Sequence, residues 1–178
     1  MPSFQKLSTL AELTVGFVGT MTPYYEKKGI PLLRSLNVEP FSINEKDMKY
    51  VSADFCELHR KSELHTGDVV IVRTGVPGTC CVIPEELDGS NCSDLVIVHP
   101  DTNKLNPDYL AAYINFMGQK QISNNKVGAV QKHFNVHTAE DMLIYLPAFE
   151  EQLKIANYIV TLNQKININK RINDNLAA

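Results

Sequence analysis

The C-terminal segment constrains the fold most, because it has the pattern of a single long helix. Apolar residues recur there at intervals of four, three and four residues: Ile155, Ile159, Leu162 and Ile166. If the helix runs from about Glu150 to Leu176, roughly 27 residues at ~1.5 Å each make it about 40 Å long. A domain built from the preceding residues is too small to cover that length, so we expect something else to pack on the helix.

The apolar seam of this helix passes Asn169 and continues to Ile172 and Leu176. A seam with one polar position is typical of a coiled-coil contact with a partner. The alternative interpretation is an amphipathic helix that folds back on its own domain. In both cases the chain divides into a globular part, 1–148, and a helix, 149–178.

The globular part has the composition of an ordinary folded domain, since the chain is 44% hydrophobic and 21% charged. Runs rich in β-branched residues predict strands at 69–73, 79–83, 95–98 and 143–146. A turn at 76–78 joins the first two as a hairpin. We therefore expect an α+β fold: a mixed, mostly antiparallel sheet with flanking helices, followed by one long coiled-coil-like C-terminal helix.

Three further segments carry local signals. The run GIPLLRSLNV, which begins at Gly29, predicts a short strand in which Pro31 favours an edge or the first position. Asn106 is a helix cap followed by proline, so a helix is expected over 107–117. The segment 50–60 fits neither the helical nor the strand period, and both interpretations stay open.

The charge balance gives no global attraction to phosphate, because the formal net charge is −3. Any nucleic-acid contact must therefore come from a local basic face. Two stretches carry suitable residues: Lys27, Lys28 and Arg34 in the first, and Lys120, Lys126, Lys132 and His133 in the second. The alternative is that these are scattered, solvated charges.

No set of residues in the sequence forms a catalytic or metal centre. The 4 cysteines and 5 histidines lack zinc or metalloprotease spacing, and no G-x-x-x-x-G-K-[ST] phosphate loop occurs. The run Asn106-Pro107-Asp108-Tyr109 differs by one residue from the Asn-Pro-Pro-Tyr motif of adenine methyltransferases, and a helix cap explains it better. We expect no cofactor, no metal and reduced cysteines. Because about 18 consecutive apolar residues occur nowhere, we also expect a cytoplasmic protein.

Five pieces of the sequence occur in the order found in one protein family. They are GIPLLRSLNV, LHTGDVVIVRTGVPG, the Leu-Asn-Pro-Asp-Tyr-Leu helix, VGAVQKHFNV and IYLPAFEEQLKI. In this order they resemble the target-recognition domain of type I restriction-modification specificity subunits. The closing pattern of strand, proline, Glu150-Glu151-Gln152 and apolar helix is the most specific of the five.

The resemblance implies a protein without enzymatic activity that recognises a few base pairs of double-stranded DNA. In this family long helices act as spacers and dock the modification (methyltransferase) subunits, and through them the restriction subunit. An adenine methyltransferase and an endonuclease are thereby directed to a split site. The globular part would be the recognition domain, and the helix would face a partner, a second recognition domain or a homodimer through these residues: Ile155, Ile159, Leu162, Ile166, Ile172 and Leu176.

A full specificity subunit carries two recognition domains and two helical spacers, whereas this chain has one of each. Either a natural half-subunit pairs with itself to recognise a symmetric site, or the chain is a fragment of a longer protein. The helix stops at Ala178, within what would be a longer spacer in many relatives, and this slightly favours a truncated chain.

Base recognition needs side chains that present hydrogen-bond donors and acceptors to a groove edge. The first candidates lie on the resembling segments: Arg34, Asn37, Lys126, Gln131, Lys132 and His133. The second candidates, for phosphate or groove contact, are Thr20, Tyr24, Lys27, Lys28 and Arg73. For each of them the alternative is a solvated or structurally hydrogen-bonded residue.

Two other functions fit the same sequence. The chain could be the recognition domain of a fused methyltransferase-nuclease, in which catalysis lies elsewhere in a longer protein. It could also be a protein–protein interaction module whose apolar helix binds a partner and whose domain does not bind DNA.

Overall fold

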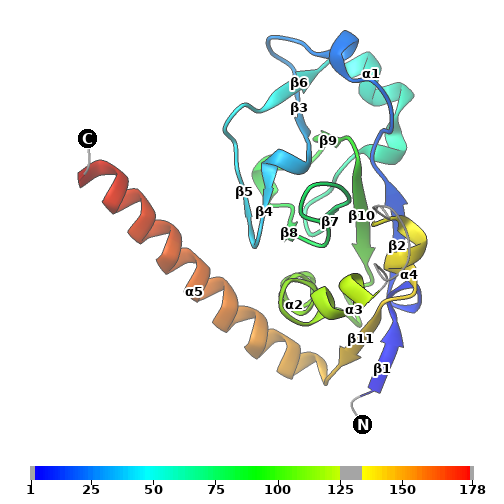
Figure 1. Cartoon of the computed structure of the whole chain (residues 1–178), viewed down its shortest axis with the longest axis vertical. Coiled ribbons are helices and arrows are strands. Elements are labelled where there is room, and N and C mark those ends of the chain that lie inside the picture. The colour runs from blue at the N-terminus through cyan, green and yellow to red at the C-terminus, as the bar shows by residue number, and fades with distance from the viewer. Residues whose placement is uncertain (1–2, 125–133, 177–178) are drawn as a thin grey trace.

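The computed structural model describes residues 3–124 and 134–176, and it contains a mixed α/β body from which one long helix extends (Figure 1). The body is built around a four-stranded antiparallel sheet of order β2-β10-β7-β8. Its strands are β2 (Ala11–Val15), β7 (Val69–Val72), β8 (Cys80–Val82) and β10 (Leu95–Pro100). The predicted hairpin and the strand at 95–98 are confirmed.

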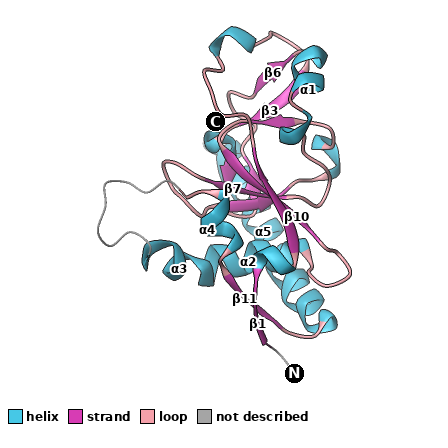
Figure 2. Ribbon diagram, turned by 90° about the vertical axis from the view of Figure 1, so that its right-hand side faces the viewer, coloured by secondary structure: helices cyan, strands magenta, loops and turns pink. Residues whose placement is uncertain are grey.

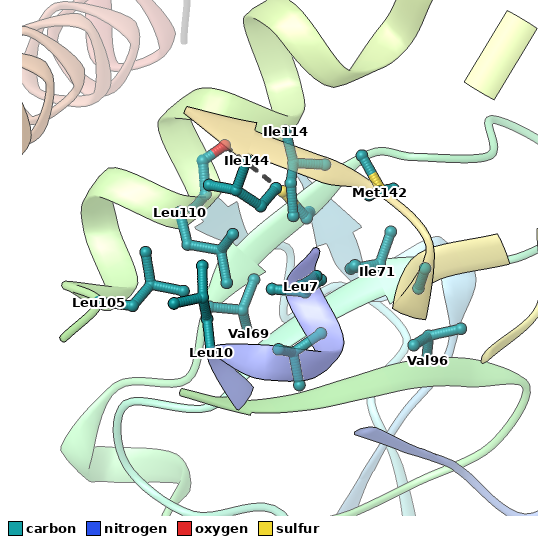
Figure 3. Close-up of a cluster of buried hydrophobic side chains, with 14 of the residues drawn as sticks. Leu7, Leu10, Val69, Ile71, Val96, Leu105, Leu110, Ile114, Met142 and Ile144 are labelled. Carbon is teal, nitrogen blue, oxygen red and sulfur yellow. Dashed lines mark hydrogen bonds between the residues drawn. The ribbon is translucent and has the colours of Figure 1, made fainter. Parts of the chain in front are cut away.

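The two central strands are hydrophobic on both faces, because the sheet separates two cores. Val69, Ile71 and Val96 face one cluster, in which they meet Leu110 and Ile144 (Figure 3). Side chains on the opposite face of the same strands form the second cluster, with residues of the 33–43 segment and the 83–92 segment. Burial on both sides explains why β7 and the first four residues of β10 are continuous runs of Val, Ile and Leu.

The helix that begins at Pro107 is confirmed at its start and differs at its end. Asn106 caps α2 (Pro107–Tyr113), with its side-chain oxygen accepting from the Tyr109 N–H at 2.9 Å. The expected continuation to residue 117 is a π-helical turn, Ile114–Gly118, and α3 (Gln119–Asn124) follows.

The π-helical turn contains Asn115, whose side chain bonds to a strand that is distant in the sequence. Its amide nitrogen donates to the carbonyls of Cys80 and Ala111, both at 2.9 Å, and its oxygen accepts from the Cys80 N–H at 3.2 Å. The side chain therefore pairs with the outer edge of β8 and, together with the Phe41 N–H, satisfies the main chain of that strand edge.

A smaller three-stranded sheet of order β6-β3-β9 lies beyond one end of the main sheet. It consists of β3 (Ile30–Leu33), β6 (Lys49–Val51) and β9 (Asn91–Cys92). At Pro31, β3 pairs with β6 alone, because its pairing with β9 covers the next two residues. Proline is tolerated at such a position since no N–H is needed on the open side.

The segment left open by the sequence contains both element types. β6 is followed at once by α1 (Ala53–Leu58), capped by the Ser52 hydroxyl, which accepts from the Phe55 N–H at 3.1 Å. The small sheet, α1 and residues 17–29 share a separate apolar cluster with Met21, Val51 and Phe55. We call residues 17–33 and 49–62 the small lobe.

The remaining strands are β1 (Ser3–Lys6), β4 (Val38–Glu39), β5 (Ser42–Ile43) and β11 (Leu143–Leu146). β1 and β11 form an antiparallel ribbon, and β4 and β5 form a short hairpin. The predicted strand at 143–146 is thus confirmed. One further short helix is α4 (Val136–Glu140), which contacts β2 and is labelled in Figure 2. Short 3-10 turns lie at Leu7–Thr9, Thr22–Tyr24, Ser35–Asn37, Arg60–Ser62 and Glu85–Leu87.

The C-terminal helix α5 (Phe149–Leu176) matches its prediction closely, at 28 residues. Its first turns bury Gln152 and Ala156 against the body, one side of the helix stays half-buried as far as Asn163, and the last turns extend away (Figure 1). Of the predicted seam, Ile159 is half-buried against the body, and the other members are exposed: Ile155, Leu162, Ile166, Ile172 and Leu176. Across the described residues, no helix is long and apolar enough to cross a membrane.

Candidate nucleic-acid interface

The segment that follows β2 is held in place by an aromatic cluster in the small lobe. The ring of Phe17 lies 5.4 Å from that of Phe55 and 4.7 Å from that of His59, and the ring of Tyr24 lies 5.1 Å from that of Phe55. Phe55 is buried, whereas Tyr24 is 44% exposed. The cluster therefore fixes the backbone of an otherwise irregular surface segment.

This segment gathers four of the predicted contact residues on the surface. Thr20, Tyr24, Lys27 and Lys28 are all exposed, and they lie within nine consecutive positions. The Glu26 N–H donates to the Tyr50 carbonyl at 2.9 Å, which ties the dilysine turn to β6. The turn ends at Gly29. No larger residue can replace this glycine, because a Cβ there would collide with the Val51 carbonyl oxygen.

Arg73, predicted as a surface contact, instead braces three segments from the inside. Its side chain is 16% exposed, and Nη1 donates to Asp94 at 2.7 Å. Its Nε donates to the Phe134 carbonyl and its own carbonyl accepts from the Phe134 N–H, both at 3.3 Å. The Thr74 hydroxyl donates to the same carboxylate at 3.0 Å. The Arg73 guanidinium is thus hydrogen-bonded to other parts of the folded chain.

The two remaining candidates from the GIPLLRSLNV run also point inward. Asn37 is fully buried, and its amide nitrogen donates to the Asn44 carbonyl at 2.9 Å while its oxygen accepts from the Arg34 N–H at 3.1 Å. The Arg34 side chain is 17% exposed and donates to the Asp47 carbonyl at 2.6 Å. Both residues shape the β4–β5 region, so the expectation that they face a groove does not fit their placement.

The other first candidates for base contact lie outside the described residues: Lys126, Gln131, Lys132 and His133. Phe134, which follows them, is placed by its paired hydrogen bonds with Arg73. Asp94 in turn donates its N–H to the Phe17 carbonyl at 3.0 Å. Phe134 therefore lies at the same end of the main sheet as the start of the 17–28 segment.

Sequence reasoning missed Asp94, the residue that joins these segments. It has a positive φ of 53°, which aspartate tolerates better than most residues. The signal that could have found it is the Ser-Asp pair before a β-branched run, which marks a strand start. The aromatic cluster could not be found in this way either, because its members Phe17 and His59 are 42 positions apart in the sequence.

The titratable groups of the described residues give no sign of a nucleophile or metal centre. Burial raises the pKa of the thiols of Cys80, Cys81 and Cys92, and it does so less strongly for Cys56. Protonated, buried thiols are poor nucleophiles. No group of three or more His, Cys, Asp or Glu side chains that could hold a metal ion occurs within the described part of the chain.

Comparison with known proteins gives one family match. The family model described as "Type I restriction modification DNA specificity domain" matches residues 23–178. No curated protein matches the chain. The matched range includes the dilysine turn, the small lobe from residue 23 onward, strands β7, β8 and β10 of the main sheet, and α5.

Solved structures share the fold over nearly the whole chain. A chain from "Structural basis underlying complex assembly and conformational transition of the type I R-M system" has a TM-score of 0.72 and 17% identity, covering 98% of this chain and 41% of that one. The HsdS subunit from Thermoanaerobacter tengcongensis has a TM-score of 0.65 and 18% identity, covering 96% and 39%. The type I restriction-modification S subunit from M. genitalium has a TM-score of 0.68 and 14% identity, covering 99% and 42%. This chain thus spans about two fifths of the length of each.

Proposed function

Because the chain belongs to the family of type I restriction-modification DNA specificity domains, we propose that it recognises one part of a split double-stranded DNA target. The family match over residues 23–178 is the observation that carries this proposal. In this function the chain has no catalytic centre of its own. It directs an adenine methyltransferase, and through it an endonuclease, to the site.

The DNA-binding face in this proposal is the small-lobe surface formed by Thr20, Tyr24, Lys27 and Lys28. These side chains are exposed on a segment that the aromatic cluster holds in place. The two lysines would neutralise phosphates, and Thr20 and Tyr24 can offer hydroxyl groups to the backbone or a groove edge. Lys126, Gln131, Lys132 and His133 remain proposed base contacts, on the chain segment that ends at Phe134.

Arg34, Asn37 and Arg73 take a different part in the proposal. Their polar groups are hydrogen-bonded within the fold, so they support the surface segments rather than contact DNA. Replacing any of them would alter DNA binding through the folded structure. This separates them from the two lysines, whose loss should leave stability unchanged.

The division into a recognition domain, 1–148, and a spacer helix, 149–178, also belongs to this proposal. The exposed apolar residues Leu162, Ile166 and Ile172 supply α5 with a surface for a modification subunit, a second recognition domain or a second copy of the chain. The same exposed surface favours the second candidate function, a protein-interaction module that does not bind DNA.

A DNA-binding titration separates the two functions. The complex of this chain with its modification subunit is titrated with target DNA at several salt concentrations. Lys27→Ala/Lys28→Ala should weaken binding and reduce the slope of log K against log salt by about 0.9 for each phosphate that is no longer neutralised. Lys6→Ala/Lys104→Ala is the control of equal charge, because both of those lysines pair with carboxylates outside the small lobe. Unchanged binding by the first variant would refute the proposed face.

A further inference from the structure

The direction of α5 is fixed at two separated places on the body. At the first, Gln152 accepts from the Asn106 N–H at 3.0 Å and donates to the Lys104 and Pro147 carbonyls at 3.0 and 3.1 Å. At the second, the Asn163 amide donates to the Phe41 carbonyl at 3.1 Å. Within the described part of the chain, Gln152 and Asn163 are the side chains of α5 that hydrogen-bond to the body.

α5 packs on α2, and beside that contact a cavity separates the helix from the rest of the body. It measures about 320 Å³ and is lined on the helix side by Ile159, Val160 and Asn163, and on the body side by Phe41 and Asp108, among others. Close packing restricts the angle of a helix, and next to this cavity α5 has no packed side chains to do so. The Asn163–Phe41 hydrogen bond crosses this gap and supplies the missing constraint.

Phe41 lies at the tip of the β4–β5 hairpin and is well anchored. It has a positive φ of 63°, its N–H donates to the Cys80 carbonyl at 3.2 Å, and its ring lies 5.5 Å from that of Phe116. The hairpin is closed from inside by Asn37, which bonds to the Asn44 carbonyl. The main chain of Phe41 thus links the edge of the main sheet to α5.

We propose that the β4–β5 hairpin is a strut, acting through Phe41 and Asn163, that sets the direction of α5 relative to the small lobe. This inference rests on the proposed function, in which α5 connects the recognition domain to a second one. The direction of the helix then determines the distance between the two half-sites on DNA, and Asn163 becomes a positioning residue for target spacing.

A small movement at Asn163 produces a larger movement at the C-terminal end of the helix. Asn163 lies eleven residues after Gln152, or about 16 Å along the axis, whereas Leu176 lies about 36 Å from Gln152. A displacement at Asn163 is therefore about doubled at Leu176. A shift of a few ångströms at the far end is comparable to the ~3.4 Å rise of one base pair.

Distance measurement by pulsed electron paramagnetic resonance tests the strut on the full chain. Spin labels are placed at Ile168→Cys on α5 and Glu86→Cys on the body, both exposed positions. Labelled chain is diluted with unlabelled chain so that distances within one molecule dominate. Asn163→Ala should broaden or shift the distance distribution. Asn157→Ala, an exposed asparagine on the same helix, should leave it unchanged.

The outcome decides the inference without depending on DNA. Asn163→Ala does not threaten folding, because alanine is the better helix former and the control gains the same propensity. An unchanged distribution in Asn163→Ala refutes the strut. In cells with the modification subunit, the same variant should methylate sites with altered spacing between unchanged half-sites, and an unaltered spacing refutes the role in target choice. If the parent chain itself directs no methylation, the proposed function fails while the distance result still stands.

Discussion

The backbone N–H of Asn106 donates to the side-chain oxygen of Gln152 at 3.0 Å, so the residue that caps α2 is itself held by α5. Gln152 is 1% exposed and binds the Lys104 and Pro147 carbonyls as well. One buried amide therefore joins the start of α2, the turn before it and the turn that leads into α5.

Replacing Gln152 with leucine should destabilise the protein more than any surface change. One buried N–H and two carbonyls lose their partner, and unpaired buried groups cost about 1–3 kcal/mol each before relaxation and water entry. We expect a loss of about 3 kcal/mol in the free energy of unfolding, measured by urea denaturation. The exposed control Asn157→Leu should change it by less than about 1 kcal/mol. Equal stability of the two variants would contradict the role of Gln152.

Asp94→Asn should weaken the side-chain bonds that join residue 94 to Arg73 and Thr74. Asparagine keeps the positive φ and the shape, but Arg73 loses the charge that faces its largely buried guanidinium. The expected loss of unfolding free energy is about 1.5 kcal/mol. Asp141→Asn, which breaks the exposed pair with Lys6, should cost much less, because solvent screens that pair. A larger loss in the Asp141 variant would contradict this ranking.

The His99–Asp68 pair should make stability depend on pH. A 2.7 Å hydrogen bond to Asp68 raises the pKa of His99, with burial opposing it and Glu12 adding a smaller attraction. A raised folded-state pKa means that the stabilisation is complete below the unfolded pKa of about 6.5 and is lost as pH rises through the folded value. The stability difference between the parent chain and His99→Gln should therefore be larger near pH 5.5 than near pH 8.5. A difference that is constant or grows with pH would contradict the assignment.

The buried cysteines should be chemically silent in the folded protein. Cys80, Cys81 and Cys92 are 0% exposed, and burial raises the pKa of each thiol. At about pH 8 a chromogenic disulfide reagent should label none of these three in the native state and all of them after denaturation. Cys56 is 8% exposed and should react slowly. Rapid labelling of Cys81 in the native state would contradict this prediction, because it would mean that the second cluster opens easily.

Local signals were predicted well from the sequence. The Asn106 cap, the hairpin of β7 and β8 and the long C-terminal helix depend on neighbouring residues or on a regular period, and each is confirmed. The family resemblance is confirmed as well. These features need no knowledge of what packs against them.

Features that depend on distant partners could not be predicted. Asn37 is a sensible base contact in a linear sequence, and only the folded β4–β5 hairpin buries it. Within the π-helical turn, Asn115 pairs with Cys80, 35 positions away. Arg73 is similar, since its carboxylate partner is 21 positions ahead. In each case a polar side chain that looked free is bound by backbone or charge brought to it by the fold.

The most direct test of the central claim is methylation mapping by long-read sequencing. Cells that express this chain with its cognate modification subunit are compared with cells that lack the chain. The account predicts a split adenine-methylated motif that is present only with the chain, and a palindromic motif if two copies pair through α5. Absence of any new motif, despite a stable complex with the modification subunit, would contradict the role in DNA recognition and favour a protein-interaction module.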